Sequence, residues 1–266
     1  MVLYTFCLLL QAQRKNGSVE MGRVDKKYGL SRNGQKFKQN AMKIISYNIH
    51  HYSQKKIDTI LEFGADVYIL PEIHSSAEVA LPEEYTLFRF ANPEESTKGL
   101  GIICKAMHGF YVPEWFCQEH KYIMPLCCSD LLLIGMWPTI TKLSKNMGYP
   151  QIALEAIKYY SQYFNKKRVI LSGDFNCFVG QKDESPKRGT LLQIVEYLSR
   201  YNIYSLYHKQ SNENFGNESK TTYHWLFKEE QSFFLDYTFT NIKEVKYELA
   251  EWNSKFSDHH AQIIEI

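Results

Sequence analysis

Apolar and polar residues alternate along residues 42–266 in a pattern that predicts short strands interleaved with a few helices. The stretch "MKIISYN" (42–48) is apolar and β-branched, which is typical of a strand. "KKIDTILEFG" (55–64) has apolar residues at helical spacing and closes on a glycine, and "DVYILPE" (66–72) again has the character of a strand. The pattern therefore predicts a β-α-β unit at the start of the folded region.

The remaining elements are mostly strands. Two helices are predicted by "YPQIALEAIKYYSQYFNKK" (149–167) and "GTLLQIVEYLSRYN" (189–202). Further strands are predicted by "YTLFRFA" (85–91), "GLGIICK" (99–105), "DLLLIGMW" (130–137), "RVILSGD" (168–174), "TTYHWLF" (221–227), "FFLDYTFT" (233–240), "VKYELAEW" (245–252) and "AQIIEI" (261–266). Because the strands cluster rather than alternate strictly with helices, the expected architecture is two packed sheets covered by helices.

The chain is expected to divide near Met42. Residues 11–41 lack apolar periodicity and are rich in Lys, Arg, Gln, Asn and Gly, which predicts that residues 1–41 form a basic leader that is unfolded or loosely attached. The apolar stretch before residue 11 has no positively charged start, so a secretory signal stays open as an alternative. A second alternative is that translation begins at Met42.

Composition is that of an ordinary globular protein. The 266 residues are 44% hydrophobic and 15% aromatic, and no run approaches the roughly 18 apolar residues that a membrane-spanning helix needs. Six cysteines without metal-ligand spacing argue against a disulfide framework and a zinc site, and favour reduced thiols in a cytoplasmic setting. The formal charge of +2 is uneven, since residues 1–41 carry +6 and residues 42–266 carry −4. Any basic patch on the folded region must therefore be local.

Polar side chains stand where predicted strands end or begin. Each of them has an ordinary alternative: Asp and Asn favour tight turns, Glu72 can be a surface carboxylate, and "SDH" can be a cap or loop. Taken together they predict a site, because strand ends in layered folds converge on one rim. These residues are Asn48, Glu72, Asp174, Asn176, Asp236, Asp258 and His259.

The chemistry of this set suits phosphate. Carboxylate and amide oxygens without cysteine are the ligands of a hard cation such as Mg²⁺ or Mn²⁺. A histidine that one carboxylate orients can bond a phosphoryl oxygen, or move a proton, with its other ring nitrogen.

The ordered segments "ISYNIH", "ILPEIH", "ILSGDFN", "FLDYTFTN" and "FSDHH" resemble the endonuclease/exonuclease/phosphatase superfamily, which includes exonuclease III, apurinic endonucleases and deoxyribonuclease I. The resemblance spans residues 42–266. It implies a four-layer α/β sandwich, in which two mixed β-sheets pack face to face with helices outside. It also implies cleavage of phosphoester bonds with Mg²⁺ or Mn²⁺ as cofactor.

The resemblance also implies roles for individual residues. Glu72 matches the principal metal-binding glutamate, Asn48 the amide beside it, and Asp258 a further acidic residue of the metal shell. Asp174 matches the aspartate that positions or deprotonates the attacking water, and Asn176 the residue that orients that water or the phosphate. Asp236 matches the aspartate that orients the catalytic histidine, His259.

Two positions depart from the superfamily pattern. His50 stands where nuclease members often carry an aspartate, so the metal shell has one carboxylate fewer. Trp137 stands where many relatives have a His or Tyr; its ring can stack on a base or sugar of the substrate, or it can simply pack in the core.

The leading hypothesis is a divalent-metal-dependent phosphodiesterase that hydrolyses nucleic acid, as an endonuclease or exonuclease. A phosphatase or phosphodiesterase acting on a small or lipid-linked phosphate is the alternative, because loops rather than the fold set the substrate and a domain of charge −4 is not an obvious DNA binder. A non-catalytic descendant that binds a partner through the cleft is a third hypothesis. The sequence indicates no membrane association, and no protein partner can be deduced from it.

Overall fold

The elements β1 (Lys43–Ser46), α1 (Gln54–Leu61) and β2 (Val67–His74) open the fold in a computed structural model that describes residues 41–141, 144–182, 184–185 and 187–266. β1 and β2 pair in parallel, as the predicted β-α-β unit requires. The helix begins where the Ser53 side chain accepts a hydrogen bond from the backbone N–H of Lys56. The predicted leader lies, except for Ala41, outside the described residues.

Two mixed sheets form the centre of residues 42–266. The first sheet has the order β12-β13-β1-β2-β4-β3 and the second the order β5-β6-β7-β11-β8, while β10 and β9 form a separate hairpin. The strands of the first sheet not yet given are β3 (Tyr85–Phe90), β4 (Lys98–Lys105), β12 (Lys246–Leu249) and β13 (Gln262–Glu265). The others are β5 (Ile123–Cys128), β6 (Leu131–Met136), β7 (Arg168–Asp174), β8 (Tyr204–Ser205), β9 (Tyr223–His224), β10 (Ser232–Phe233) and β11 (Asp236–Thr240).

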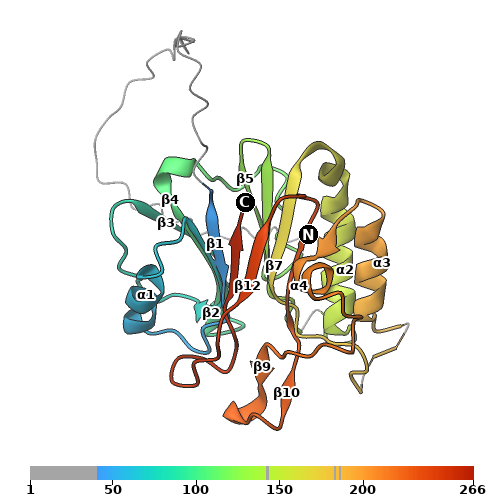
Figure 1. The fold of residues 1–266 in the computed structure, drawn as a ribbon. Coiled ribbons are helices and arrows are strands. Elements are labelled where there is room, and N and C mark those ends of the chain that lie inside the picture. The colour runs from blue at the N-terminus through green and yellow to red at the C-terminus, as the bar shows by residue number, and fades with distance from the viewer. Residues whose placement is uncertain (1–40, 142–143, 183, 186) are drawn as a thin grey trace, which may run out of the picture. The chain divides into compact units, whose positions relative to one another are not determined.

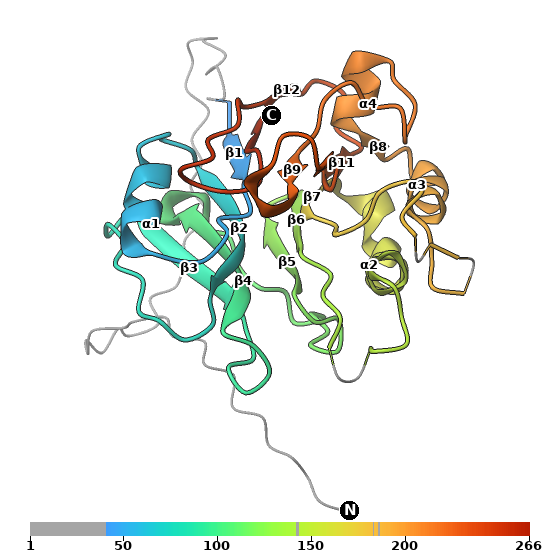
Figure 2. The ribbon, with the colours of Figure 1, turned by 90° about the horizontal axis from the view of Figure 1, so that it is seen from below.

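Helices cover the outer faces of both sheets, which makes four layers (Figures 1 and 2). Ile57 and Ile60 of α1 pack into the core on the outer side of the first sheet. The helices α2 (Tyr149–Tyr160) and α3 (Leu191–Ser199) bury their apolar faces against the second sheet, and α4 (Leu206–Ser211) lies beside β11. The architecture is therefore the α/β sandwich that the sequence predicts, with two mixed sheets between helices.

The two sheets meet face to face through a shared apolar core. Ile69 and Ile102 from the first sheet and Leu133 and Ile170 from the second belong to one buried cluster. Gly135 on β6 permits the close approach, because a Cβ atom there would lie 2.9 Å from the Cδ1 atom of Ile102 on β4. None of the helices in the described ranges is long and apolar enough to cross a membrane.

Three predicted elements differ from the structure. The strand predicted over residues 221–227 is limited to β9, because the chain turns into a 3₁₀ helix (Trp225–Phe227) in which Leu226 has a φ of 53°. The strand predicted over residues 233–240 is split into β10 and β11. The helix predicted over residues 149–167 is α2 followed by a 3₁₀ helix (Ser161–Lys166).

Candidate active site

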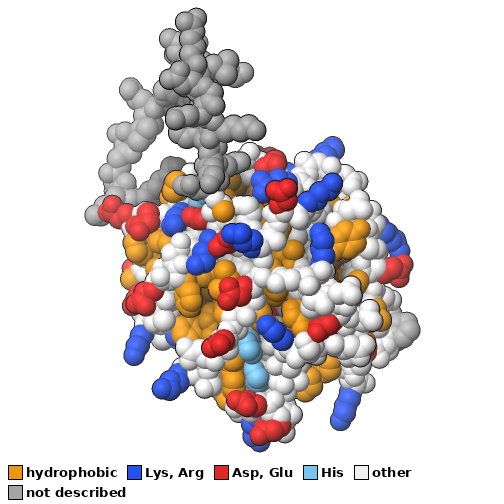
Figure 3. Space-filling view, in the orientation of Figure 1, with side chains coloured by type: hydrophobic (Ala, Val, Ile, Leu, Met, Phe, Trp, Pro, Cys, Tyr) orange, Lys and Arg blue, Asp and Glu red, His pale blue; other side chains and the backbone are white. Residues whose placement is uncertain are grey.

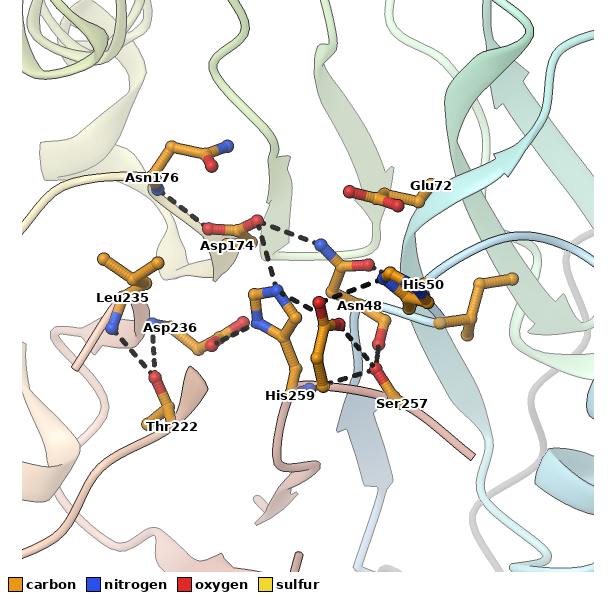
Figure 4. A network of polar contacts seen from close by, with 12 residues as sticks. Asn48, His50, Glu72, Asp174, Asn176, Thr222, Leu235, Asp236, Ser257 and His259 are labelled. Carbon is orange, nitrogen blue, oxygen red and sulfur yellow. Dashed lines mark hydrogen bonds and ion pairs between the residues drawn. The ribbon is translucent and has the colours of Figure 1, made fainter. Parts of the chain in front are cut away.

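Polar side chains converge at one rim of the two sheets, since strands of both directions reach that rim. β1, β2 and β7 arrive with their C-terminal ends, which bring Asn48, Glu72 and Asp174. β11 and β13 run antiparallel to β7 and β1, so their N-terminal ends bring Asp236 and His259 to the same place. Figure 4 shows these side chains, far apart in sequence, beside one another. The predicted gathering of strand-end residues is therefore present in the structure.

His259 is held by Asp236 in a buried pair. The Nδ1 atom of His259 lies 2.8 Å from Oδ2 of Asp236, and the two residues are 4% and 2% exposed. The backbone N–H of Asp236 donates to the Thr222 hydroxyl. Burial by itself would lower the pKa of His259, but the Asp236 carboxylate, together with the charges of Asp174 and Asp258, outweighs it and raises that pKa to about 9. The imidazole is therefore oriented, and its Nε2 atom faces the other acidic groups of the site.

Asp174 is the second buried carboxylate of the rim. Its Oδ2 atom accepts a hydrogen bond of 3.0 Å from the Asn48 amide and lies 3.9 Å from the Nε2 atom of His259, while its Oδ1 atom accepts from the backbone N–H of Asn176. Burial raises the pKa of Asp174 to about 7, against the opposing charge of His259. A carboxyl group with this pKa can exchange a proton near neutral pH.

The backbone around Asp174 explains why the sequence "GDFN" ends β7. A Cβ atom on Gly173 would lie 1.9 Å from the carbonyl oxygen of Met136, and the φ of Gly173 is 151°, so a side chain cannot be accommodated there. Asn176 has a φ of 53°, a conformation that asparagine tolerates better than most residues, and its amide donates to the carbonyl of Pro138. The turn therefore has a structural reason and also places Asp174 and Asn176 at the rim.

Asn48 and Ser257 join the two halves of the site. The Ser257 hydroxyl donates to the backbone carbonyl of Asn48 over 2.6 Å and accepts a hydrogen bond from the backbone N–H of His259. The side-chain oxygen of Asn48 accepts from the backbone N–H of His50. One serine thus links the end of β1 to the segment that carries the histidine.

Glu72 reaches the rim through a distorted stretch of β2. The pairing of β2 with β4 shifts register between Pro71 and Ile73, and Glu72 has a φ of 67°. Glutamate in this left-handed conformation costs on the order of 1 kcal/mol or more, a strain that is common at functional sites. The carboxylate forms an ion pair with the ammonium of Lys98. Burial alone would raise the pKa of Glu72, but Lys98 holds it below its usual value.

Asp258 is paired with His50. The Nδ1 atom of His50 lies 3.0 Å from Oδ2 of Asp258, and Oδ1 of Asp258 lies 3.9 Å from the Nε2 atom of His259. Burial lowers the pKa of His50, although the charge of Asp258 opposes the change. His50, which stands where the sequence departs from the superfamily pattern, therefore contacts the carboxylate of Asp258 through a ring nitrogen.

A pocket of about 630 Å³ opens onto these groups. The polar part of its lining includes Glu72, Asp174, Asn176, Asp258 and His259. The lining is also aromatic, and the ring of Phe178 stacks on that of Phe233 with centroids 4.7 Å apart. The other aromatic residues of the lining are Tyr149, Tyr223 and Trp225. The pocket thus combines hydrogen-bonding groups with flat aromatic surfaces, as ligand sites commonly do.

The ligand atoms that these side chains offer are of the type that a hard cation prefers. Glu72 and Asp258 offer carboxylate oxygens and Asn48 an amide oxygen, and Mg²⁺ keeps several waters and needs only one or two protein carboxylates. Across the described ranges, no three His, Cys, Asp or Glu side chains are grouped so that they could hold a metal ion by themselves. Both carboxylates also have nitrogen partners, Lys98 and His50. A cation at Glu72 would therefore have to compete with the groups already there.

Trp137 lies away from this pocket. Its side chain is 5% exposed, packs against the ring of Tyr122 at 5.0 Å between centroids and belongs to the core between the sheets. It is not part of the pocket lining. The structure therefore supports core packing, rather than substrate stacking, for this residue.

Sequence reasoning does not identify several residues that shape the site. Ser257 and Thr222 are single hydroxyls inside quoted motifs, and their role depends on backbone groups brought close by folding. Tyr223 is part of a predicted strand, and its ring lies 4.6 Å from that of His259. Lys98 directly precedes the predicted strand "GLGIICK", and only the pairing of β4 with β2 places it at Glu72.

Comparison with known proteins gives matches to solved structures. An AP endonuclease from Leishmania major aligns with a TM-score of 0.64 at 11% identity, over 85% of this chain and 87% of that one. The endonuclease domain of a telomere-specific non-LTR retrotransposon aligns with a TM-score of 0.55 at 14% identity, over 85% of this chain and 98% of that one. A mannosyl-6-phosphatase from Bacteroides thetaiotaomicron aligns with a TM-score of 0.52 at 13% identity, over 85% and 99% of the two chains.

No protein-family model matches the sequence, and a search of curated proteins gives no match. At these identities the structural matches concern the fold. They confirm the predicted one: residues 42–266 have the fold of the endonuclease/exonuclease/phosphatase superfamily, in which nucleases and phosphatases both occur.

Proposed function

We propose that this chain, with the fold of the endonuclease/exonuclease/phosphatase superfamily, is a phosphoester hydrolase, and more specifically a divalent-metal-dependent phosphodiesterase that cleaves nucleic acid. The observation that carries the proposal is the buried pair of His259 and Asp236, with the free ring nitrogen of His259 3.9 Å from Asp174 at the pocket. An oriented imidazole beside a carboxyl group of raised pKa is an acid–base arrangement that a purely structural site does not need.

The roles follow from the protonation states. Asp174, with a pKa near 7, accepts the proton of a water molecule that attacks phosphorus, and the Asn176 side chain orients that water or the phosphate. His259, whose pKa is near 9, is mainly protonated at neutral pH and donates a hydrogen bond to a phosphoryl oxygen as negative charge develops there. Attack forms the new P–O bond as the bond to the leaving oxygen breaks.

Glu72, Asp258 and the side-chain oxygen of Asn48 are the residues that would hold Mg²⁺ or Mn²⁺. When bound, the ion supplies positive charge to the phosphoryl oxygens and the leaving oxygen. The retrotransposon and parasite endonucleases named above support this proposal at the level of the fold.

The pocket lining favours nucleic acid as substrate. The lining presents aromatic rings as well as polar groups, from Phe178, Tyr223, Trp225 and Phe233. Nucleic-acid bases stack on such rings irrespective of base sequence. An endonuclease and an exonuclease are both compatible with this lining.

The thiols described in the structure are free, which supports a cytoplasmic setting as a further part of the proposal.

Surface charge favours a second candidate, a phosphatase or phosphodiesterase for a small or lipid-linked phosphate. Residues 42–266 carry a net charge of −4, and Figure 3 shows basic and acidic side chains interspersed over the visible face without one large basic patch. Polymeric nucleic acid is usually held by such a patch. A non-catalytic binding role is the least supported, because the acid–base groups are present and oriented.

An activity panel tests the proposal. The purified protein is incubated with single- and double-stranded DNA, RNA, abasic DNA, phosphoinositides and p-nitrophenyl phosphate, with Mg²⁺, with Mn²⁺ and with EDTA. We expect metal-dependent cleavage of nucleic acid that falls at least about 100-fold in Asp174→Asn and His259→Ala. Cleavage of only the small phosphates would support the second candidate. Absence of hydrolysis on every substrate, with the fold intact, would remove the enzymatic proposal.

A further inference from the structure

Lys98 is positioned at Glu72 by the distortion of β2. In the pairing of β2 with β4, Lys98 lies opposite His74, and the register shift between Pro71 and Ile73 leaves Glu72 as the extra residue. The ammonium of Lys98 contacts the Oε2 atom of Glu72, and the side chains are 29% and 16% exposed. Both residues line the pocket. The strained glutamate and the first residue of β4 therefore meet at the place where the proposed cation belongs.

A second lysine on the same strand provides a comparison. Lys105, at the other end of β4, pairs with Asp66 at 3.0 Å, and these side chains are 26% and 17% exposed. Asp66 also accepts from the backbone N–H of Lys43, and neither Asp66 nor Lys105 lines the pocket. In both ion pairs a lysine of β4 meets a carboxylate and the side chains have similar exposure, but only the pair of Lys98 and Glu72 lies at the pocket.

Lys98 and a divalent cation would compete for the carboxylate of Glu72. The Oε2 atom, one of the two oxygens that could coordinate the ion, already accepts a hydrogen bond from the ammonium of Lys98. An ammonium within a few ångströms of a doubly charged ion is repelled by several kcal/mol at the effective dielectric of a partly buried site, so each cation weakens the binding of the other. A metal ion must therefore displace the lysine or bind more weakly beside it.

We propose that Lys98 is a built-in counter-cation of Glu72, which competes with the divalent ion and thereby sets the metal affinity of this site. The inference rests on the proposed function for the identity of Glu72 as a metal ligand. The lysine lowers metal affinity and, in return, keeps a strained and largely buried carboxylate compensated while no metal is bound. His50 contacts Asp258 in the same way, so the second proposed metal-binding carboxylate also has a partner already.

Direct measurement of Mn²⁺ binding by isothermal titration calorimetry, without substrate, tests the competition. Lys98→Met keeps the aliphatic stem and removes the charge, and Lys105→Met is the matched control at the other end of β4. We expect Lys98→Met to bind Mn²⁺ at least tenfold more tightly than the wild type, and Lys105→Met to bind it unchanged. Addition of Glu72→Gln to Lys98→Met should abolish the gain.

Equal or weaker binding of Mn²⁺ by Lys98→Met, with a folded protein by circular dichroism, would overturn the inference. Lys98→Gln is the second variant, and it must change affinity in the same direction if the charge is the cause. Because the assay needs no turnover, the two proposals can fail separately. If the wild type cleaves substrate with metal but Lys98→Met binds Mn²⁺ no more tightly than the wild type, only the role of Lys98 is refuted. A gain in affinity without hydrolysis of any substrate refutes only the proposed function.

Discussion

Replacement of Asp236 by asparagine should destabilise the protein in a way that depends on pH. In the folded state burial lowers the pKa of His259, but Asp236, together with the smaller effects of Asp174 and Asp258, raises it from its ordinary value of 6.5 to about 9. Removing the charge of Asp236 removes the largest of the effects that raise this pKa, so the pKa should fall. One pKa unit corresponds to about 1.4 kcal/mol, so the whole shift corresponds to on the order of 3 kcal/mol while His259 is protonated, and Asp236 contributes the largest part of it.

The sign of the pH dependence follows from the raised pKa. A histidine with a higher pKa in the folded than in the unfolded state adds stability that is complete below the unfolded pKa of about 6.5 and is lost as pH rises through the folded pKa of about 9. The destabilisation caused by Asp236→Asn should therefore be largest near pH 6 and shrink toward pH 9.5. The hydrogen bond of 2.8 Å to His259 can persist through the asparagine oxygen, so geometry alone does not predict this trend.

Urea unfolding at pH 6 and pH 9.5, with EDTA present, measures the difference. Asp130→Asn is the control, because the Asp130 side chain is 61% exposed and its nearest cationic partner, Arg168, is 3.9 Å away. That control should change stability by less than about 0.5 kcal/mol at both pH values. A destabilisation by Asp236→Asn of the same size at both pH values would refute the assumption that the charge on His259 carries the effect.

Three further predictions concern the scaffold of the site and the far end of the sheet. Gly173→Ala should cost roughly 3 kcal/mol or more in urea unfolding, because its Cβ atom would lie 1.9 Å from the Met136 carbonyl oxygen; an unchanged midpoint would contradict this. Ser257→Ala should cost about 1–3 kcal/mol, since the hydroxyl's donor bond to Asn48 and its acceptor bond from a backbone N–H are both buried, whereas full stability would mean that neither matters. Burial would raise the pKa of Asp66, but its hydrogen bonds keep that pKa below the usual value. Asp66→Asn should therefore destabilise at pH 7, and the loss should shrink as the pH falls through the lowered pKa of the wild-type carboxyl; a pH-independent loss in urea unfolding would show otherwise.

Apolar periodicity predicted most elements, and the exceptions have physical reasons. β5 is not apparent in the sequence because it contains Pro125 and two adjacent cysteines, and proline is tolerated there since β5 is an edge strand of its sheet. The break between β10 and β11 arises because Leu235 and Asp236 donate their backbone N–H groups to the Thr222 hydroxyl, a contact between residues 13 and 14 positions apart. Such a contact leaves no periodic signal.

The local sequence determined which polar residues stand at strand ends, because a carboxylate or amide directly after an apolar run is visible without a structure. For that reason Asn48, Asp174 and His259 could be proposed from the chain alone. The direction in which each strand runs decided that these residues share a rim. The packing of one sheet against the other decided that the side chain of Trp137 lies in the core. Only the tertiary structure could place Lys98 on Glu72, since that contact requires the register shift between β2 and β4, which depends on how two strands pair rather than on the residues of either one.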